Sequence, residues 1–290
     1  MPPTKSPSFA VKLGLKTKPT KPLCHYTSQN GLIGILKSKA MYATDAAYLN
    51  DSQEVIYAIN LAKEYFKNHH TKDPRFMTEV AKILEKADGH AGGLPVYVAS
   101  FSEEPDLLSQ WRGYCPNGPG FALSLSADRM MTLAQTHDWE IFKCIYDEDE
   151  QVEVLKRMLD EAVSVKSPLK GFPTEVAFGL LLLSFASVFK HPKFSEESEW
   201  RATKRTGGTP FAPPGKPAIP SNVRPGGSTL IPYIPFRLTP KPTEAIELAQ
   251  LIVGPTPHPS LAVRAVNALL SEYKVDCAEV RSSEIPFRNW

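Results

Sequence analysis

The sequence predicts a single α+β domain over residues 21–290, preceded by a disordered tail over residues 1–20. Segments with the period-two pattern of strands and segments with helical periodicity occur along the same chain. The last of them, residues 249–280, have a β-α-β order. With 290 residues, of which 42% are hydrophobic and 22% charged, the chain is long enough to bury a sizeable core.

Composition narrows the classes of partner and compartment. A net charge of +2 is too small to indicate nucleic acid or an anionic membrane as the general partner. The four cysteines lie far apart without the paired spacing of a zinc site, so we predict no metal and no disulfide. No signal peptide is visible, and the longest apolar run, residues 176–189, is too short to span a bilayer. We therefore expect a cytoplasmic protein without a membrane partner.

The first half of the domain is predicted to alternate short strands and helices. Residues 1–20 carry Lys and Pro without periodicity, which is typical of a tail. Strands are expected at residues 23–28 and 40–45, with an amphipathic helix at 29–39 between them. Asp51 and Glu54 have the spacing of a capping box before a helix that reaches residue 66, and a second helix is expected at 73–86. Residues 95–102 read as a strand that ends in Ser100 and Ser102, followed by a short helix at 106–114.

The second half contains longer helices and one irregular insertion. Residues 121–126 alternate as a half-buried strand, and 139–146 are a further strand candidate. Residues 148–165 have one apolar face, whereas 174–190 are apolar nearly all round, which favours a central buried helix. Residues 206–243 are dense in Pro and Gly and are expected to be irregular, with 228–238 at most an edge strand because of its prolines. A strand at 249–253, a helix at 259–273 and a strand at 276–280 complete the chain.

Two acids separated by one residue, Glu197 and Glu199, give the strongest indication of chemistry. On an extended backbone both would project from one face, which is unfavourable unless a cation, hydrogen bonds or a polar ligand compensates. The alternative is a solvated acidic strand entry in which Arg201 pairs with them. If Glu199 and His25 share a cleft, an enzyme is favoured, whereas a pair between Glu199 and Arg201 on the outside favours an interaction module. Trp111, Tyr114 and Trp200 are predicted to be mainly structural.

Seven short motifs occur in order along the chain. They are His25-Tyr26-Thr27, Asn50-Asp51 with Glu54, Ser100-Phe101-Ser102, Trp111 with Tyr114, Glu199-Trp200-Arg201, Val253-Gly254-Pro255 and residues 283–288. Each motif is weak alone, but in this order they resemble a prokaryotic family, domain-of-unknown-function family 2971, over about residues 22–288.

A more distant resemblance is to ADP-ribosyltransferases of the His-Tyr-Glu type. It implies a split of two small twisted, mostly antiparallel sheets with surrounding helices, and NAD as substrate. By this resemblance His25 holds the adenosine-side ribose and the nicotinamide amide, Tyr42 stacks on nicotinamide with Tyr48 as a second stacking candidate, and Glu199 holds the nicotinamide ribose. Glu197 matches a residue that orients the acceptor. The remaining cofactor-binding candidates are Tyr26, Thr27, Ser100 and Ser102.

Three functional hypotheses follow. The first is an NAD-dependent ADP-ribosyltransferase that modifies a protein or nucleic-acid acceptor, as a bacterial toxin or an antiviral defence effector. Its chemistry suits a late glutamate, because a preorganised carboxylate stabilises the positive charge that develops on the ribose. The second is a phosphotransferase or hydrolase acting on a nucleotide end, and the third is a non-catalytic nucleotide-binding or interaction module.

Overall fold

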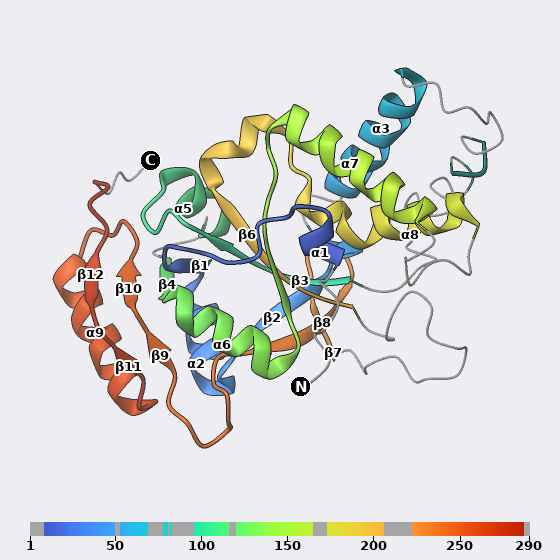
Figure 1. The fold of residues 1–290 in the computed structure, drawn as a ribbon. Coiled ribbons are helices and arrows are strands. Elements are labelled where there is room, and N and C mark those ends of the chain that lie inside the picture. Colours follow the sequence, from blue (N-terminus) through green and yellow to red (C-terminus); the bar gives the residue numbers. More distant parts are fainter. Residues whose placement is uncertain are drawn as a thin grey trace.

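The computed structural model describes residues 9–49, 53–68, 78–80, 82, 96–115, 120–164, 173–205 and 222–286. Within them the chain is a mixed α+β structure with one open, mostly antiparallel sheet and surrounding helices (Figure 1). The strands of this sheet are β1 (Leu23–Thr27), β2 (Ala40–Asp45), β3 (Val96–Ser102), β4 (Phe121–Leu125), β5 (Glu140–Lys143), β6 (Glu199–Arg205), β7 (Asn222–Pro225), β8 (Leu230–Arg237), β10 (Gln250–Val253) and β12 (Val280–Ser282). Two further strands, β9 (Glu247–Leu248) and β11 (Asp276–Cys277), form a small parallel pair.

The helices are interspersed with these strands along the chain. They are α1 (Phe9–Lys12), α2 (Gln29–Ser38), α3 (Gln53–Asn68), α5 (Leu108–Tyr114), α6 (Ala127–His137), α7 (Glu148–Val163), α8 (Thr174–Phe185) and α9 (Pro259–Glu272), with 3-10 turns η1 (Ala46–Tyr48), η2 (Ala186–Val188) and η3 (Pro192–Glu197). Side-chain caps fix several of their starts: Ser28, Ser126 and Asp147 each accept from a backbone N–H in the first turn. None of the helices in this part of the chain has the length and apolar character that a bilayer crossing needs.

The large sheet consists of two halves that meet on strand β3. One half has the order β12-β10-β4-β1, and the other has the order β5-β6-β3-β2-β8-β7. Strands β1 and β2 pair with the same edge of β3 at its opposite ends, β1 through Cys24↔Ser102 and β2 through Thr44↔Val98 and Asp45↔Tyr97. The predicted pair of separate sheets is therefore corrected to one continuous sheet. Its two halves diverge where β1 leaves β3.

Two hydrophobic clusters cover the two faces of this sheet. Ile141 and Phe142 are neighbours on β5, so their side chains point to opposite faces, and they belong to different clusters. The cluster around Ile141 includes apolar residues of α2, α6 and α9. The cluster around Phe142 is formed with α3, α7 and α8, which Figure 1 places together at one end of the molecule. The expected central helix is α8, whose apolar side chains belong to this second cluster.

Two predictions about segment structure were wrong. Of the predicted tail, residues 9–20 are described. Ala10 on α1 and the following Leu13 and Leu15 are buried in the second cluster. Of the expected insertion, residues 206–221 lie outside the described part, but 222–237 form the hairpin β7–β8. Strand β8 pairs with both β2 and β7 and so is not an edge strand. Its prolines are tolerated because each removes one N–H toward one neighbouring strand only.

The remaining expectations agree with the structure where it describes them. Strands β10 and β12 are parallel and joined through α9, as the β-α-β pattern predicted, although the second strand is divided into β11 and β12. Asn50 and Asp51, most of the helix expected at 73–86, and the last motif residues, Phe287 and Arg288, lie outside the described residues.

Candidate functional site

A small pocket opens where the two halves of the sheet diverge. Its cavity volume is about 30 Å³, and it is lined by Cys24, His25, Tyr26, Ser100, Phe101, Ser102, Gln110, Tyr114, Glu197 and Glu199. The register explains why distant segments meet here, because Ser102 on β3 is paired with Cys24 on one side and with Glu199 on the other. Paired residues on neighbouring strands share a face. A cavity of this volume has room for about two water molecules or one small polar group.

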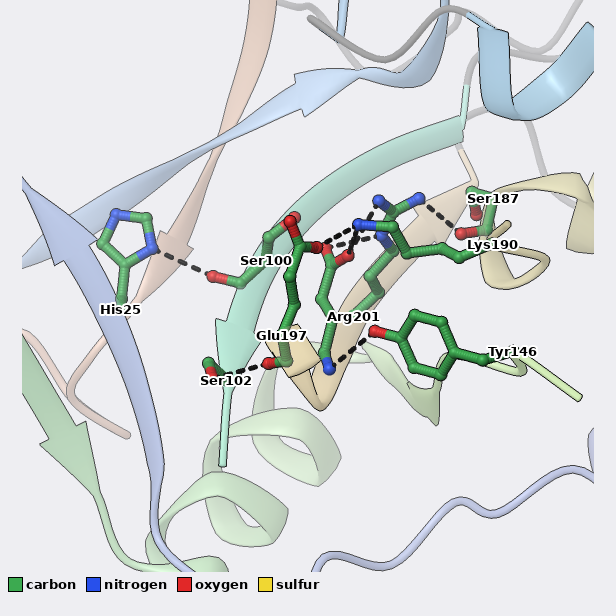
Figure 2. Close-up of polar contacts among 9 residues, drawn as sticks. His25, Ser100, Ser102, Tyr146, Ser187, Lys190, Glu197 and Arg201 are labelled. Carbon is green, nitrogen blue, oxygen red and sulfur yellow. Dashed lines mark hydrogen bonds and ion pairs between the residues drawn. The ribbon is translucent and has the colours of Figure 1, made fainter. Parts of the chain in front are cut away.

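The glutamates approach the pocket from different elements. Glu199 is the first residue of β6, but Glu197 is the last residue of η3, and Ser198 between them has a left-handed backbone (φ 44°). The prediction that both lie on one extended strand was therefore wrong. Their carboxylates nevertheless meet, because both contact the ammonium of Lys190, which lies at 2.7 Å from Glu199 Oε2 (Figure 2).

Glu199 is held by two cations in a buried position. Arg201 Nε donates to Glu199 Oε1 at 2.8 Å, and its second nitrogen Nη2 donates to Oε2 at 3.1 Å. Only 5% of Glu199 and 2% of Arg201 are exposed. Burial opposes ionisation of Glu199, but the charges of Arg201 and Lys190 outweigh it and lower the pKa of Glu199 to about 2. The expected pair between Glu199 and Arg201 thus exists, but inside the protein and beside the pocket.

The cations stand behind the carboxylates as seen from the pocket. Glu197 and Glu199 line the cavity, whereas Lys190 and Arg201 are not among its lining residues in the described part of the chain. The two carboxylates and the two cations together have no net charge. Because the carboxylates line the cavity and the cations do not, the negative charge lies nearer to the cavity. Such a fixed dipole favours a ligand group that carries or develops positive charge, and it disfavours a phosphate.

Backbone and hydroxyl contacts hold the two acidic segments in place. Ser102 Oγ donates to the carbonyl of Glu197 at 2.7 Å and accepts from the N–H of Glu104 at 2.9 Å. The N–H of Glu199 donates to Tyr146 Oη at 2.9 Å. Ser102 therefore acts on the end of η3, and its hydroxyl is already engaged on both sides.

His25 directly follows Cys24, the residue through which β1 pairs with β3. Its Nδ1 lies 3.0 Å from the carbonyl oxygen of Ser100, and since a carbonyl only accepts, Nδ1 carries the proton. Burial lowers the pKa of His25, against the opposing effect of this hydrogen bond, so the ring is neutral at pH 7 with its lone pair on Nε2. Figure 2 shows Ser100 between the His25 ring and Glu197. His25 and Glu199 thus line one pocket from its two sides.

The predicted tyrosines divide between the pocket and other places. Tyr26 lines the pocket, but its hydroxyl donates to the carbonyl of Glu104 at 2.5 Å and accepts from Leu107 N–H at 2.9 Å. Tyr42 is 47% exposed and its ring contacts that of Tyr233, with centroids 4.0 Å apart. Neither Tyr42 nor Tyr48 lines the pocket that the described residues form, nor does Thr27. The expected nicotinamide-stacking residues are thus not at the glutamates.

Sequence reasoning missed four residues of the site. Lys190 directly follows the buried apolar run that ends at Phe189, and Tyr146 follows the strand β5. Gln110 and Tyr114 lie one turn apart on α5, and Tyr114, predicted to be structural, is 47% exposed and lines the pocket. Partial burial and the charges of Glu199 and Glu197 raise the pKa of Tyr114 to about 12. One sequence pattern could have indicated Lys190. It is a single lysine after an apolar run, and two acids follow it seven and nine residues later.

Two of the sequence motifs meet at Asp106 and a third approaches Trp111, and together these contacts fix α5 beside the pocket. Asp106 accepts from Trp111 Nε1 at 2.8 Å, from Ser283 Oγ at 2.6 Å and from the N–H of Glu284 at 2.8 Å. A side chain at Gly254 would meet the Trp111 ring at 2.9 Å, so glycine allows the strand end to approach the indole. The aromatic part of this cluster includes Tyr26, whose ring meets Trp111 edge-on.

Trp111 and Trp200 are buried, as predicted for structural aromatics, with 4% and 3% exposed. Trp200 Nε1 donates to Glu103 Oε1 at 2.8 Å. Trp200→Phe removes this donor and should lower the free energy of unfolding by about 1–3 kcal/mol, while ligand binding at the pocket changes less. Urea denaturation and calorimetry measure the two effects. A larger loss of ligand affinity than of stability would place Trp200 in the site instead.

The ion pairs of Glu199 predict an acid-dependent loss of stability. Because its pKa is lowered from 4.5 in the unfolded chain to about 2, its contribution is complete above pH 4.5 and is lost as the pH falls toward 2. A pKa difference of one corresponds to about 1.4 kcal/mol of unfolding free energy, so the full loss amounts to roughly 3 kcal/mol. Urea denaturation between pH 6 and pH 2.5 should show it. The Glu199→Gln variant should have a flatter pH dependence in that interval, and equal slopes would contradict this account.

Within the described residues there is no group of three or more His, Cys, Asp and Glu side chains arranged to hold a metal ion.

The comparisons with known proteins give one family. A model of the family described as "Protein of unknown function (DUF2971)" matches residues 110–202, about a third of the chain. No curated protein matches the chain, and no solved structure does. The matched segment begins at Gln110 on α5 and ends on β6, so it contains the residues that form the charged wall of the pocket. Over this segment the chain is similar to that family.

Proposed function

We propose that the chain binds NAD or a related nucleotide and transfers its ADP-ribosyl group to a protein or nucleic-acid acceptor. The observation that supports this most directly is the arrangement of charge at the pocket. Two carboxylates, Glu197 and Glu199, form its wall, with their partner cations behind them. The reacting end of NAD is a ribosyl pyridinium, which is cationic, and its cleavage leaves positive charge on the ribose. A wall of this kind stabilises that charge without any rearrangement.

In the proposed step the bond between the ribose carbon and the nicotinamide nitrogen breaks, and its electron pair stays on that nitrogen. The nicotinamide leaves as a neutral molecule. The ribose carbon then accepts a lone pair from the acceptor, whose proton passes to the solvent. Glu199, ionised by its two cations, faces the developing charge. Glu197, whose side chain is 20% exposed against 6% for Glu199, lies nearer the solvent from which an acceptor would approach.

The size of the pocket limits which part of the ligand enters it. A cavity of about 30 Å³ does not hold a dinucleotide, so we place the carboxamide end of nicotinamide inside it and the nicotinamide ribose at its mouth, against the two glutamates. The rest of NAD would lie outside, along the line where the two halves of the sheet diverge. The two halves of the sheet diverge where β1 leaves β3, and Glu199 on β6 pairs with β3 at the same point. This arrangement also supports the distant resemblance to ADP-ribosyltransferases.

The alternative of phosphoryl transfer has less support. Lys190 and Arg201 are the cations near the pocket, but each contacts Glu199, and the carboxylates stand in front of them. A phosphate group entering the cavity would meet negative charge first. The non-catalytic module remains the alternative that experiment separates from the enzyme. We propose that the protein acts in the cytoplasm, as a bacterial toxin or an antiviral defence effector. NAD is abundant in the cytoplasm where either protein would act.

The test is release of nicotinamide from NAD, measured by chromatography with and without candidate protein and nucleic-acid acceptors, together with calorimetric titration of NAD. Release that increases with an acceptor supports the transferase, and release into water alone supports the same chemistry with water as acceptor. Binding without release assigns the chain to the nucleotide-binding module. Absence of both binding and release overturns the proposal.

A further inference from the structure

Gln110 is a buried amide at the pocket. It lies on α5, is 7% exposed, and lines the cavity together with the two glutamates. Among the described residues the Gln110 side chain has no hydrogen-bond partner. Its amide atoms keep some exposed surface, whereas Arg129 Nε, Ser187 Oγ and Arg224 Nε lack both a partner and exposed surface. The amide is therefore open to the cavity. Leaving a buried amide unpaired costs about 1–3 kcal/mol, so the cavity must supply its partner.

The surroundings of Gln110 restrict what that partner is. The neighbouring walls are the carboxylates of Glu197 and Glu199, and Tyr114 follows four residues later on the same face of the helix. Tyr114 is 47% exposed and offers a ring at the pocket. The engaged hydroxyls of Ser102 and Tyr26 leave Gln110 as the neutral group best able to donate and accept at once. A flat ligand that carries a primary amide complements this set.

We propose that Gln110 is the specificity-determining residue that reads the carboxamide of the ligand. This inference rests on the proposed function and names the part of NAD that enters the pocket. The carbonyl oxygen of Gln110 accepts from the amide N–H of nicotinamide, and the N–H of Gln110 donates to its carbonyl. The ring of nicotinamide lies against Tyr114. A carboxylate in place of the carboxamide offers acceptors only, so one of the two hydrogen bonds is lost and an anion faces Glu197 and Glu199.

The experiment compares NAD with nicotinic acid adenine dinucleotide, which differs only in having a carboxylate for the carboxamide. Dissociation constants are measured by calorimetry for the wild type, for Gln110→Met, which keeps the length of the side chain, and for Gln135→Met. Gln135 is exposed on α6 and undergoes the same chemical change away from the pocket. Thermal unfolding of each variant reports whether it is folded.

We expect the wild type and Gln135→Met to bind NAD at least about 10-fold more tightly than the acid analogue. Gln110→Met should bind NAD about 10-fold more weakly than the wild type, and its preference for NAD should fall to the part that repulsion by Glu197 and Glu199 supplies. If Gln110→Met does not fold, Gln110→Leu replaces it, because it also removes both hydrogen-bonding groups without adding a charge, and the same fall in preference is expected.

The outcomes separate this inference from the proposed function. If the wild type binds and cleaves NAD but the Gln110 variant keeps the full preference for it, Gln110 holds only water, and the inference is wrong while the function stands. If the wild type binds neither dinucleotide, the proposed function fails and the inference fails with it. A reduced preference in Gln110→Met, with cleavage still detectable, supports both.

Discussion

Lys190→Met is expected to lower the free energy of unfolding by about 3–5 kcal/mol at pH 7. The ammonium of Lys190 contacts both Glu197 and Glu199, and the residue is 2% exposed. Methionine has a similar length but no charge, so two carboxylates would share one compact site without the cation between them. Repulsion and the burial of under-compensated charge both disfavour the folded state. Urea denaturation of the purified variant measures the loss.

The matched control for this prediction is Lys193→Met. Lys193 lies in η3, three residues further along, and is exposed. Its substitution should change the free energy of unfolding by no more than about 0.5 kcal/mol. Adding Glu197→Gln to Lys190→Met should recover part of the loss, because it removes one of the two repelling charges. Equal effects of the Lys190 and Lys193 substitutions would show that the buried ion pairs do not hold this site together.

Much of the fold was predictable because its segments carry their own periodicity. The strands that contain His25, Tyr42 and Ser100 were placed from local pattern, and so were α7, α9 and the β-α-β order of the C-terminal unit. Prediction failed where tertiary contacts override local signals. The burial of Leu13 depends on α3, α7 and α8, which are more than forty residues away in sequence, and nothing in the composition of the first twenty residues indicates that partnership.

The candidate site was predictable in part for a different reason. Two nearby acids imply a compensating cation, and the sequence named Arg201 as one partner. It could not name Lys190, because contact with both acids depends on the left-handed turn at Ser198, which brings the end of η3 beside the start of β6. Gln110 and Tyr114 carried no chemical pattern of their own. Only the packing of α5 against Tyr26 and the C-terminal strand, through Asp106 and Trp111, places them at the glutamates.

Glu199→Gln is expected to reduce the rate of nicotinamide release by about 100-fold or more. The substitution keeps the shape of the side chain but removes the charge that faces the ribose in the proposed mechanism, so the transition state should lose more than the ground state and NAD affinity should change little. The substitution should also lower stability, because Arg201 and Lys190 lose a buried ionic partner. Rates are therefore compared at a temperature at which circular dichroism shows the variant to be folded. Glu196→Gln, an exposed neighbour on η3, is the control and should keep wild-type turnover. A folded Glu199→Gln protein with undiminished release would exclude Glu199 from the chemistry.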